Sequence, residues 1–189
     1  MSKDATNGPT IYSTTYTNAE FGSITLASNG ESLVGLWLPG QKHYASTVVG
    51  EMVPDDTLAV FSQTTEWLDR YFAGERPDPA ELPLAPLGSP FRQRVWDKLL
   101  KIPYGRTRTY GDIAAELARE DGKEKMSAQA VGGAVGHNPS SIIIPCHRVV
   151  GTDGSLTGYA GGIGKKVKLL ELEGVQDDRL FVPTKGTAL

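Results

Sequence analysis

The spacing of hydrophobic side chains predicts a β-sheet and then a helix in the first part of the chain. Strand-forming residues fill much of residues 11–38, where the polar stretch 28–31 (SNGE) supplies a turn. Large apolar side chains recur at helical spacing over residues 57–73, and Gly74 ends that pattern. The helical set is Leu58, Phe61, Trp67, Leu68, Tyr71 and Phe72.

A proline-rich stretch separates this part from the rest of the chain. Five prolines fall within residues 77–90, and proline is excluded from the interiors of helices and sheets. We therefore predict a linker there, between an N-terminal α/β domain (residues 11–76) and a second domain (residues 91–175). Residues 1–10 are expected to be a disordered tail and residues 176–189 a C-terminal tail.

Three short helices are predicted beyond the linker. Residues 91–101 are amphipathic. Thr109 begins a second helix, with Asp112 at the spacing of a capping box, and Ser127 can cap a third helix over residues 128–135. The last two helices and their connection indicate a helix-turn-helix, although most helix pairs bind nothing.

The third of these helices has an unusual composition. Small residues make its surface nearly smooth, and Gly132 and Gly133 cost about 1 kcal/mol each in a helix interior. Tight packing on another helix would offset that cost, as would close approach of a bulky surface such as a DNA groove.

Composition and charge narrow the class of protein. The 189 residues are 39% hydrophobic and 22% charged, which is typical of a globular protein. No apolar run is long enough to span a membrane, and the polar N-terminus lacks the apolar core of a signal peptide, so a cytoplasmic location is expected. No large exposed apolar stripe is evident, so we expect a monomer. The net charge is −7 over residues 1–88 and +4 over residues 89–175. A polyanion would bind the positively charged second part in preference to the first, unless the difference is only chance variation among solvent-exposed charges.

Cys146 is the only cysteine, so neither an intrachain disulfide nor a multi-thiolate zinc site can form. We expect no metal and no cofactor. Residues 142–144 predict a short buried strand that Pro145 ends, which would present Cys146 at a rigid strand end. A lone cysteine is usually an inert buried residue, but His147 and Arg148 follow this one and would favour the reactive thiolate.

Four stretches together resemble the DNA repair alkyltransferases, the methylated-DNA–protein-cysteine methyltransferases. They are PCHRV at residues 145–149, SAQAVGGAVGHNP at 127–139, TGYAGG at 157–162 and LLELEGV at 169–175. Residues 89–175 match in nearly uninterrupted register, and residues 11–88 resemble the family's less specific N-terminal domain. The predicted fold class is α/β of the α+β kind: an antiparallel sheet with a helix, then a mostly helical domain with a helix-turn-helix and a short active-site strand.

The resemblance implies a single-turnover DNA repair reaction. A methyl or small alkyl group would pass irreversibly from guanine O6 in double-stranded DNA to Cys146, without a cofactor, a membrane or an obligate protein partner. Binding would place the helix-turn-helix in the minor groove, and the damaged base would flip out of the stack.

The resemblance also assigns site residues. Cys146 would be the nucleophile, His147 the base acting through a water molecule, Glu173 the residue that holds His147, Asn138 the support of the turn, and Tyr110 the proton donor to the leaving base. The substrate pocket would be formed by Tyr159, Gly158, Ala160, Pro145 and Val149. The implied DNA contacts are Gln129, Arg92, Gly111, Ala128, Gly132, Gly133 and Thr152.

This sequence departs from the family's usual pattern at two positions near the DNA. Gln129 stands where most familiar members have an arginine that fills the gap left by the flipped base, and His137 stands where small or basic residues are more usual. The zinc ligands of some members' N-terminal domains are also missing.

Three other classes of protein compete with this interpretation. A silent lesion-binding relative would lack the cysteine. A Cys–His hydrolase usually recruits its histidine from far along the chain rather than from the next position. A plain helix-turn-helix regulator would not need Cys146.

Overall fold

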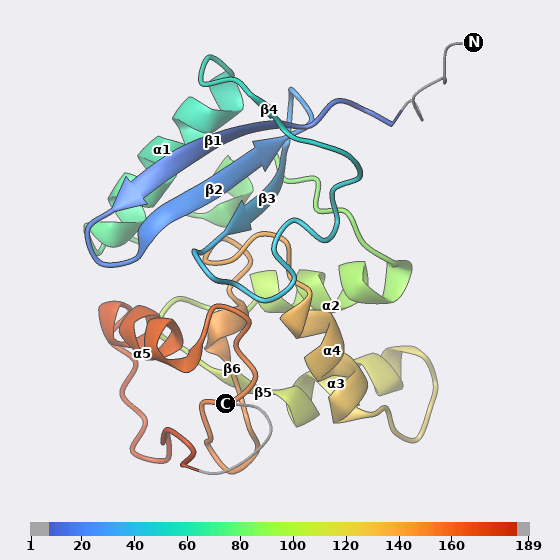
Figure 1. Ribbon diagram of the computed structural model, residues 1–189. Coiled ribbons are helices and arrows are strands. Elements are labelled where there is room, and N and C mark those ends of the chain that lie inside the picture. Colours follow the sequence, from blue (N-terminus) through green and yellow to red (C-terminus); the bar gives the residue numbers. More distant parts are fainter. Residues whose placement is uncertain (1–7, 185–189) are drawn as a thin grey trace.

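The computed structural model describes residues 8–184 and shows a mixed α and β fold (Figure 1). Residues 1–7 of the predicted N-terminal tail (residues 1–10) and residues 185–189 of the predicted C-terminal tail (residues 176–189) lie outside the described part. Four strands form one sheet in the order β3-β2-β1-β4: β1 (Tyr12–Asn18), β2 (Gly22–Ser28), β3 (Leu33–Trp37) and β4 (Val53–Pro54). Strands β1, β2 and β3 are antiparallel and β4 runs parallel to β1, so the predicted α+β class with an N-terminal antiparallel sheet is confirmed.

Helix α1 (Ala59–Phe72) lies against the sheet and buries the face that carries Phe61, Trp67 and Leu68 (Figure 1). The proline-rich segment after it follows the edge of β3. It contains a short 3-10 helix, η1 (Pro79–Glu81), and Leu33 N–H donates to the carbonyl of Pro83 at 2.8 Å.

The second part contains four helices and two short strands. They are α2 (Pro90–Leu100), α3 (Tyr110–Glu120), α4 (Ala128–Gly136), α5 (Ile163–Leu172), β5 (Arg108–Thr109) and β6 (Val149–Val150). Both predicted caps are confirmed. Thr109 Oγ1 accepts from Asp112 N–H at 3.0 Å within a capping box, and Ser127 Oγ accepts from Ala130 N–H at 3.3 Å.

The predicted strand at residues 142–144 is wrong. These residues form a tight turn in which Ile144 N–H donates to Ser140 O at 2.9 Å and Ile142 has a φ of 71°. Cys146 therefore lies in a 3-10 helix, η2 (Cys146–Arg148), and not at a strand end. The β-propensity of three isoleucines is overridden here because tertiary contacts hold the turn.

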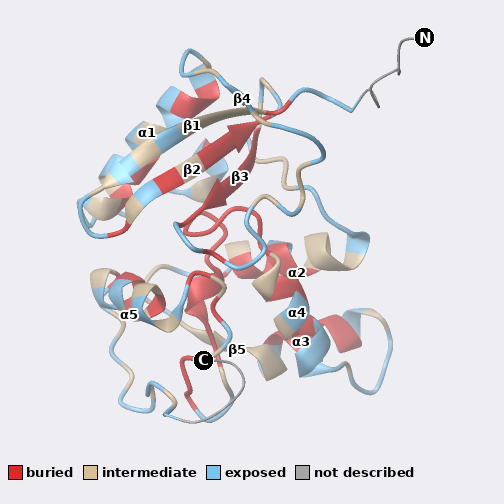
Figure 2. Cartoon of the chain, viewed as in Figure 1, coloured by how far each residue is buried: buried red, intermediate tan, exposed pale blue. Residues whose placement is uncertain are grey.

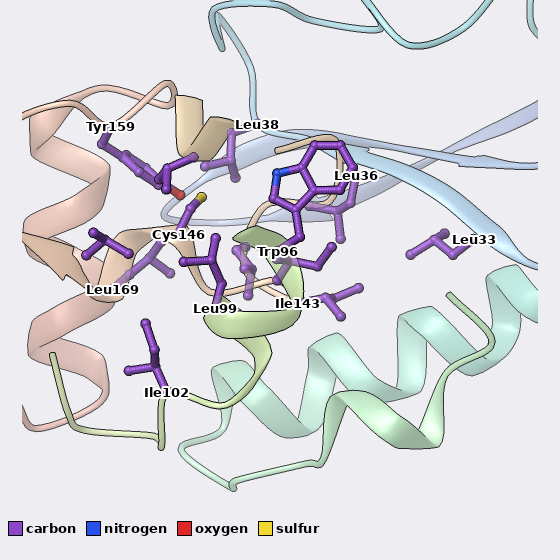
Figure 3. Close-up of a cluster of buried hydrophobic side chains, with 14 of the residues drawn as sticks. Leu33, Leu36, Leu38, Trp96, Leu99, Ile102, Ile143, Cys146, Tyr159 and Leu169 are labelled. Carbon is purple, nitrogen blue, oxygen red and sulfur yellow. The ribbon is translucent and has the colours of Figure 1, made fainter. Parts of the chain in front are cut away.

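One buried apolar cluster runs from the sheet and α1 to α2, α3 and α4, and it includes Cys146 (Figures 2 and 3). The edge of β3 joins this core to the turn, because Leu36 N–H donates to Pro139 O and Ser141 N–H donates to Leu36 O. The domain boundary within residues 77–90 stays a prediction. Within residues 8–184, no helix is long and apolar enough to cross a membrane.

Candidate active site

The Cys146 thiol is buried and held by the side chain of Asn138. The sulfur is 3.0 Å from Asn138 Nδ2, which also donates to Ile144 O at 2.7 Å, while Asn138 Oδ1 accepts from Ser140 N–H at 2.9 Å. One amide thus fixes both ends of the turn and the direction of the thiol.

Glu173 accepts hydrogen bonds from several directions. Its Oε1 lies 2.6 Å from His147 Nε2 and 2.8 Å from the Tyr71 hydroxyl, and Arg148 donates through Nε and Nη2 at 2.8 and 2.9 Å. The backbone N–H of Gly105 completes the set at 3.1 Å. Burial alone would raise the pKa of Glu173, but the bonds from His147 and Arg148 outweigh it and hold the pKa far below its usual range. The carboxylate is ionised at neutral pH.

The ionised Glu173 determines the tautomer of His147. A carboxylate can only accept, so His147 Nε2 must carry the hydrogen. Burial lowers the pKa of His147, so the ring is neutral and its lone pair lies on Nδ1. That Nδ1 is buried and has no hydrogen-bond partner among residues 8–184. The Nδ1 atom of the neutral ring is therefore the atom that can accept a proton.

The cation that lowers the pKa of the Cys146 thiol is Lys166 and not Arg148. Arg148 is occupied by Glu173 and by Ile102 O, to which Nη1 donates at 2.6 Å. Burial raises the pKa of Cys146, whereas the Asn138 hydrogen bond and the Lys166 charge act in the opposite direction. Lys166 is fully buried, its Nζ donates to Val149 O at 2.5 Å, and burial lowers its pKa to about 8.

Sequence reasoning missed both Lys166 and Tyr71. Lys166 did leave a signal, because it shares a helical face with Leu169, Leu170 and Glu173, all of which are buried on or just after α5. Tyr71 left none, because it fits the apolar face of α1 and meets Glu173 only in the folded chain.

Tyr159, Gly158 and Ala160 line a cavity of about 280 Å³, whereas Cys146 and the buried Pro145 and Val149 beside it do not line it. Figure 3 shows the Tyr159 ring close to the sulfur.

Tyr110 lies next to this cavity and donates from its hydroxyl to Thr157 O at 3.1 Å. A Cβ on Gly158 would lie 2.7 Å from the Tyr110 hydroxyl, so glycine is needed for this close approach. Burial raises the pKa of Tyr110, and the charge of Cys146 raises it further. The hydroxyl is therefore protonated at neutral pH.

Helix α4 presents a smooth exposed face. Its buried residues pack against α2 and α3, whereas Ala128, Gln129 and Gly133 are exposed. A Cβ on Gly132 would touch Tyr110 at 3.8 Å, and one on Gly133 would meet nothing within 4 Å, so packing does not demand glycine at Gly133.

The remaining predicted DNA contacts lie outside α4. Arg92 is on α2, Gly111 is on α3, and Thr152 follows β6, with its hydroxyl 3.5 Å from a Cβ built on Gly111.

Among residues 8–184, no group of three or more His, Cys, Asp or Glu side chains could hold a metal ion.

Family models match nearly the whole described chain. Residues 90–175 match the DNA-binding domain of 6-O-methylguanine DNA methyltransferase, and residues 11–86 match its ribonuclease-like domain.

Curated relatives and solved structures agree with these models. A methylated-DNA–protein-cysteine methyltransferase of Mycobacterium tuberculosis is 45% identical over 157 residues, 82% of this chain and 88% of that protein. The one from Haemophilus influenzae is 38% identical over 159 residues, 84% of each chain. A crystal structure of Mycobacterium tuberculosis OGT in complex with DNA has a TM-score of 0.74 at 42% identity, covering 89% of this chain and 94% of that one.

Proposed function

Because this chain belongs to the family of 6-O-methylguanine DNA methyltransferases, its activity is DNA repair by alkyl transfer to a cysteine, and we propose that the acceptor is Cys146. The observation that carries the assignment is the position of this cysteine. It is the only one in the chain, its sulfur lies close to the ring of Tyr159, which lines the cavity, and a buried His–Glu pair follows it (Figure 3).

In the proposed reaction His147 is the general base. Its Nδ1 takes the thiol proton through one water molecule, and Glu173 stabilises the imidazolium that forms. Lys166 and Asn138 favour the thiolate and offset part of the effect of burial, which still leaves the pKa of Cys146 raised.

The thiolate then displaces guanine from the alkyl carbon. A carbon–sulfur bond forms, the bond between carbon and O6 breaks, and the guanine leaves with that electron pair. In this proposal Tyr110 gives the leaving base a proton, and the His147 imidazolium returns the thiol proton to the Tyr110 oxygen through water, so that the thiol proton ends on guanine. The thioether has no leaving group that would restore the thiol, and one molecule therefore repairs one lesion.

On the DNA side, we propose that α4 enters the minor groove of duplex DNA that carries O6-alkylguanine and that Gln129 fills the gap left by the flipped base. The exposed smooth face of α4 supports this, because Gly133 is not required by packing. We also propose a monomer in the cytoplasm, which gel filtration and cell fractionation test.

The decisive experiment is to mix the protein with duplex DNA containing O6-methylguanine and to weigh the intact protein. We expect a gain of one methyl group, which peptide mapping places on Cys146. The Cys146→Ala variant should bind the same DNA and gain no mass. More than one turnover per protein, or a methyl group on another residue, would contradict the proposal.

A further inference from the structure

The N-terminal half supplies part of the wall of the cavity beside Tyr159. The segment that follows β3 contributes Gly40, Lys42 and His43 to the cavity, which Gly136 and residues 158–163 also line. The backbone N–H of Lys42 donates to Ala160 O at 2.9 Å, so the two walls are joined at the rim.

Two histidines meet across this rim. The rings of His43 and His137 are stacked, with centroids 3.8 Å apart and planes inclined by 23°. His137 is the C-cap of α4, and its Nδ1 donates to Gly133 O at 2.7 Å. His43 has a φ of 59°, which is unfavourable for a residue with a side chain, so contacts such as this stack must hold it. The loop after β3 is thereby fixed to the end of α4.

The rim also carries positively charged groups. Burial lowers the pKa of His43, and the charges of His137, Arg92 and Lys42 lower it further, so the His43 ring is neutral at neutral pH. Among residues 8–184, none of the four forms an ion pair. The Lys42 ammonium and the Arg92 guanidinium, which have no carboxylate partner within the described residues, attract a polyanion, and the His43 ring offers an N–H donor.

We propose that this mouth cluster (Lys42, His43, Arg92 and His137) binds the phosphate backbone of the DNA strand whose base enters the cavity. A base cannot reach the cavity unless the phosphates on either side of its nucleotide approach the rim. Ammonium, guanidinium and imidazole N–H groups are the donors that contact phosphates in protein–DNA complexes. The inference rests on the proposed function, and it gives the N-terminal half a direct part in DNA binding.

Binding to lesion-free duplex DNA, measured over a range of salt concentrations, tests the mouth cluster separately from the chemistry. Losing one cationic phosphate contact should make the slope of log K against log salt shallower by about 0.9 in Lys42→Gln. The His43→Asn variant keeps a residue that tolerates a positive φ, and it should bind several-fold more weakly at every salt concentration. Lys168→Gln on α5, where Lys168 pairs with Glu20, is the charge-matched control and should bind as the wild type does.

Alkyl transfer from free O6-methylguanine base completes the test, because the free base carries no phosphate. Both variants should lose far less of the reaction with the free base than of the affinity for DNA, and thermal unfolding shows whether they are folded. Wild-type affinity and salt slope in both variants would overturn the inference, as would an equal loss of reaction with the free base. If instead the wild-type protein fails to methylate Cys146 at all, it is the proposed function that fails.

Discussion

His147 contacts Glu173 at 2.6 Å, which raises the pKa of the ring, but burial outweighs this contact and lowers the pKa. Because the pKa of His147 lies below its ordinary value of about 6.5, the neutral base persists below that pH. The wild-type transfer rate should therefore stay level as the pH falls to 6.5 and decline only below it.

Replacing the base, in His147→Gln, should lower the transfer rate by about 100-fold or more. The pH dependence should then move upward, toward the raised pKa of the buried Cys146 thiol. Rapid-quench measurements across pH check both effects, with thermal unfolding as the control for folding. An unchanged pH–rate profile would leave His147 a structural residue only.

Tyr71 brings a hydroxyl from α1 to the same carboxylate, so we predict that Tyr71→Phe alters the base rather than the thiol. Losing this donor leaves the charge of Glu173 less compensated, which stabilises the imidazolium and raises the pKa of His147. The acid limb of the pH–rate profile should shift to higher pH, and the free energy of unfolding should fall by about 2 kcal/mol.

The matched control for Tyr71 is Tyr104→Phe, because the Tyr104 hydroxyl donates to Leu172 O and not to Glu173. It should leave the pH profile in place. If Tyr71→Phe lowers stability without moving the acid limb, Tyr71 supports packing alone.

At the scale of elements, a substitution on α4 can test DNA binding without disturbing the packing of the protein. Alanine at Gly133 meets nothing within 4 Å, so Gly133→Ala should stabilise the fold by up to about 1 kcal/mol through helix propensity. It should nevertheless weaken binding to duplex DNA if that face lies in a groove. Urea unfolding and a binding titration check the two effects, with Ala130→Ser on the same helix as the comparison. Unchanged DNA affinity would place the groove contact on another surface.

Gln129 is exposed in the first turn of α4, where we propose that it replaces the flipped base. A guanidinium stacks better than an amide and adds charge, so Gln129→Arg should speed repair in duplex DNA, and Gln129→Ala should slow it. Both effects should be much smaller on single-stranded DNA, because flipping there costs little. Should the ratio of duplex to single-strand rates stay the same in both variants, Gln129 is not the residue that replaces the flipped base.

At the scale of the whole molecule, Glu173 ties together α1, the loop after α2, η2 and α5. Its pKa in the folded protein lies below the ordinary value of about 4.5. Its contribution to stability is therefore complete above that pH and is lost as the pH falls toward the folded-state pKa.

Glu173→Gln should lower the free energy of unfolding at pH 7 by about 3 kcal/mol, because the buried Arg148 loses its partner. The deficit relative to the wild type should shrink as the pH drops below 4.5, where the wild type loses the same interaction. Urea unfolding at several pH values measures the difference. A deficit independent of pH would show that lost packing, not lost charge, explains the effect.

The sequence by itself determined the features that depend on local interactions. The caps at Thr109 and Ser127 need only residues three positions apart, and the helices follow from the spacing of their apolar residues. The motif around Cys146 identified the family, because its residue types are read without knowledge of their contacts. The family match also brought Glu173 and Asn138 to attention, which spacing alone would not have done.

The tertiary structure decided the environment of those residues. Tyr71 and Glu173 are 102 positions apart, and no local pattern encodes their hydrogen bond. The backbone before Cys146 is a turn because distant partners hold it against the β-propensity of its isoleucines. Burial, and not sequence neighbours, sets the pKa of Cys146 and makes Lys166 the cation that acts on it. Protonation depends on distance and solvent exposure, and these are defined only when the chain has closed around the site.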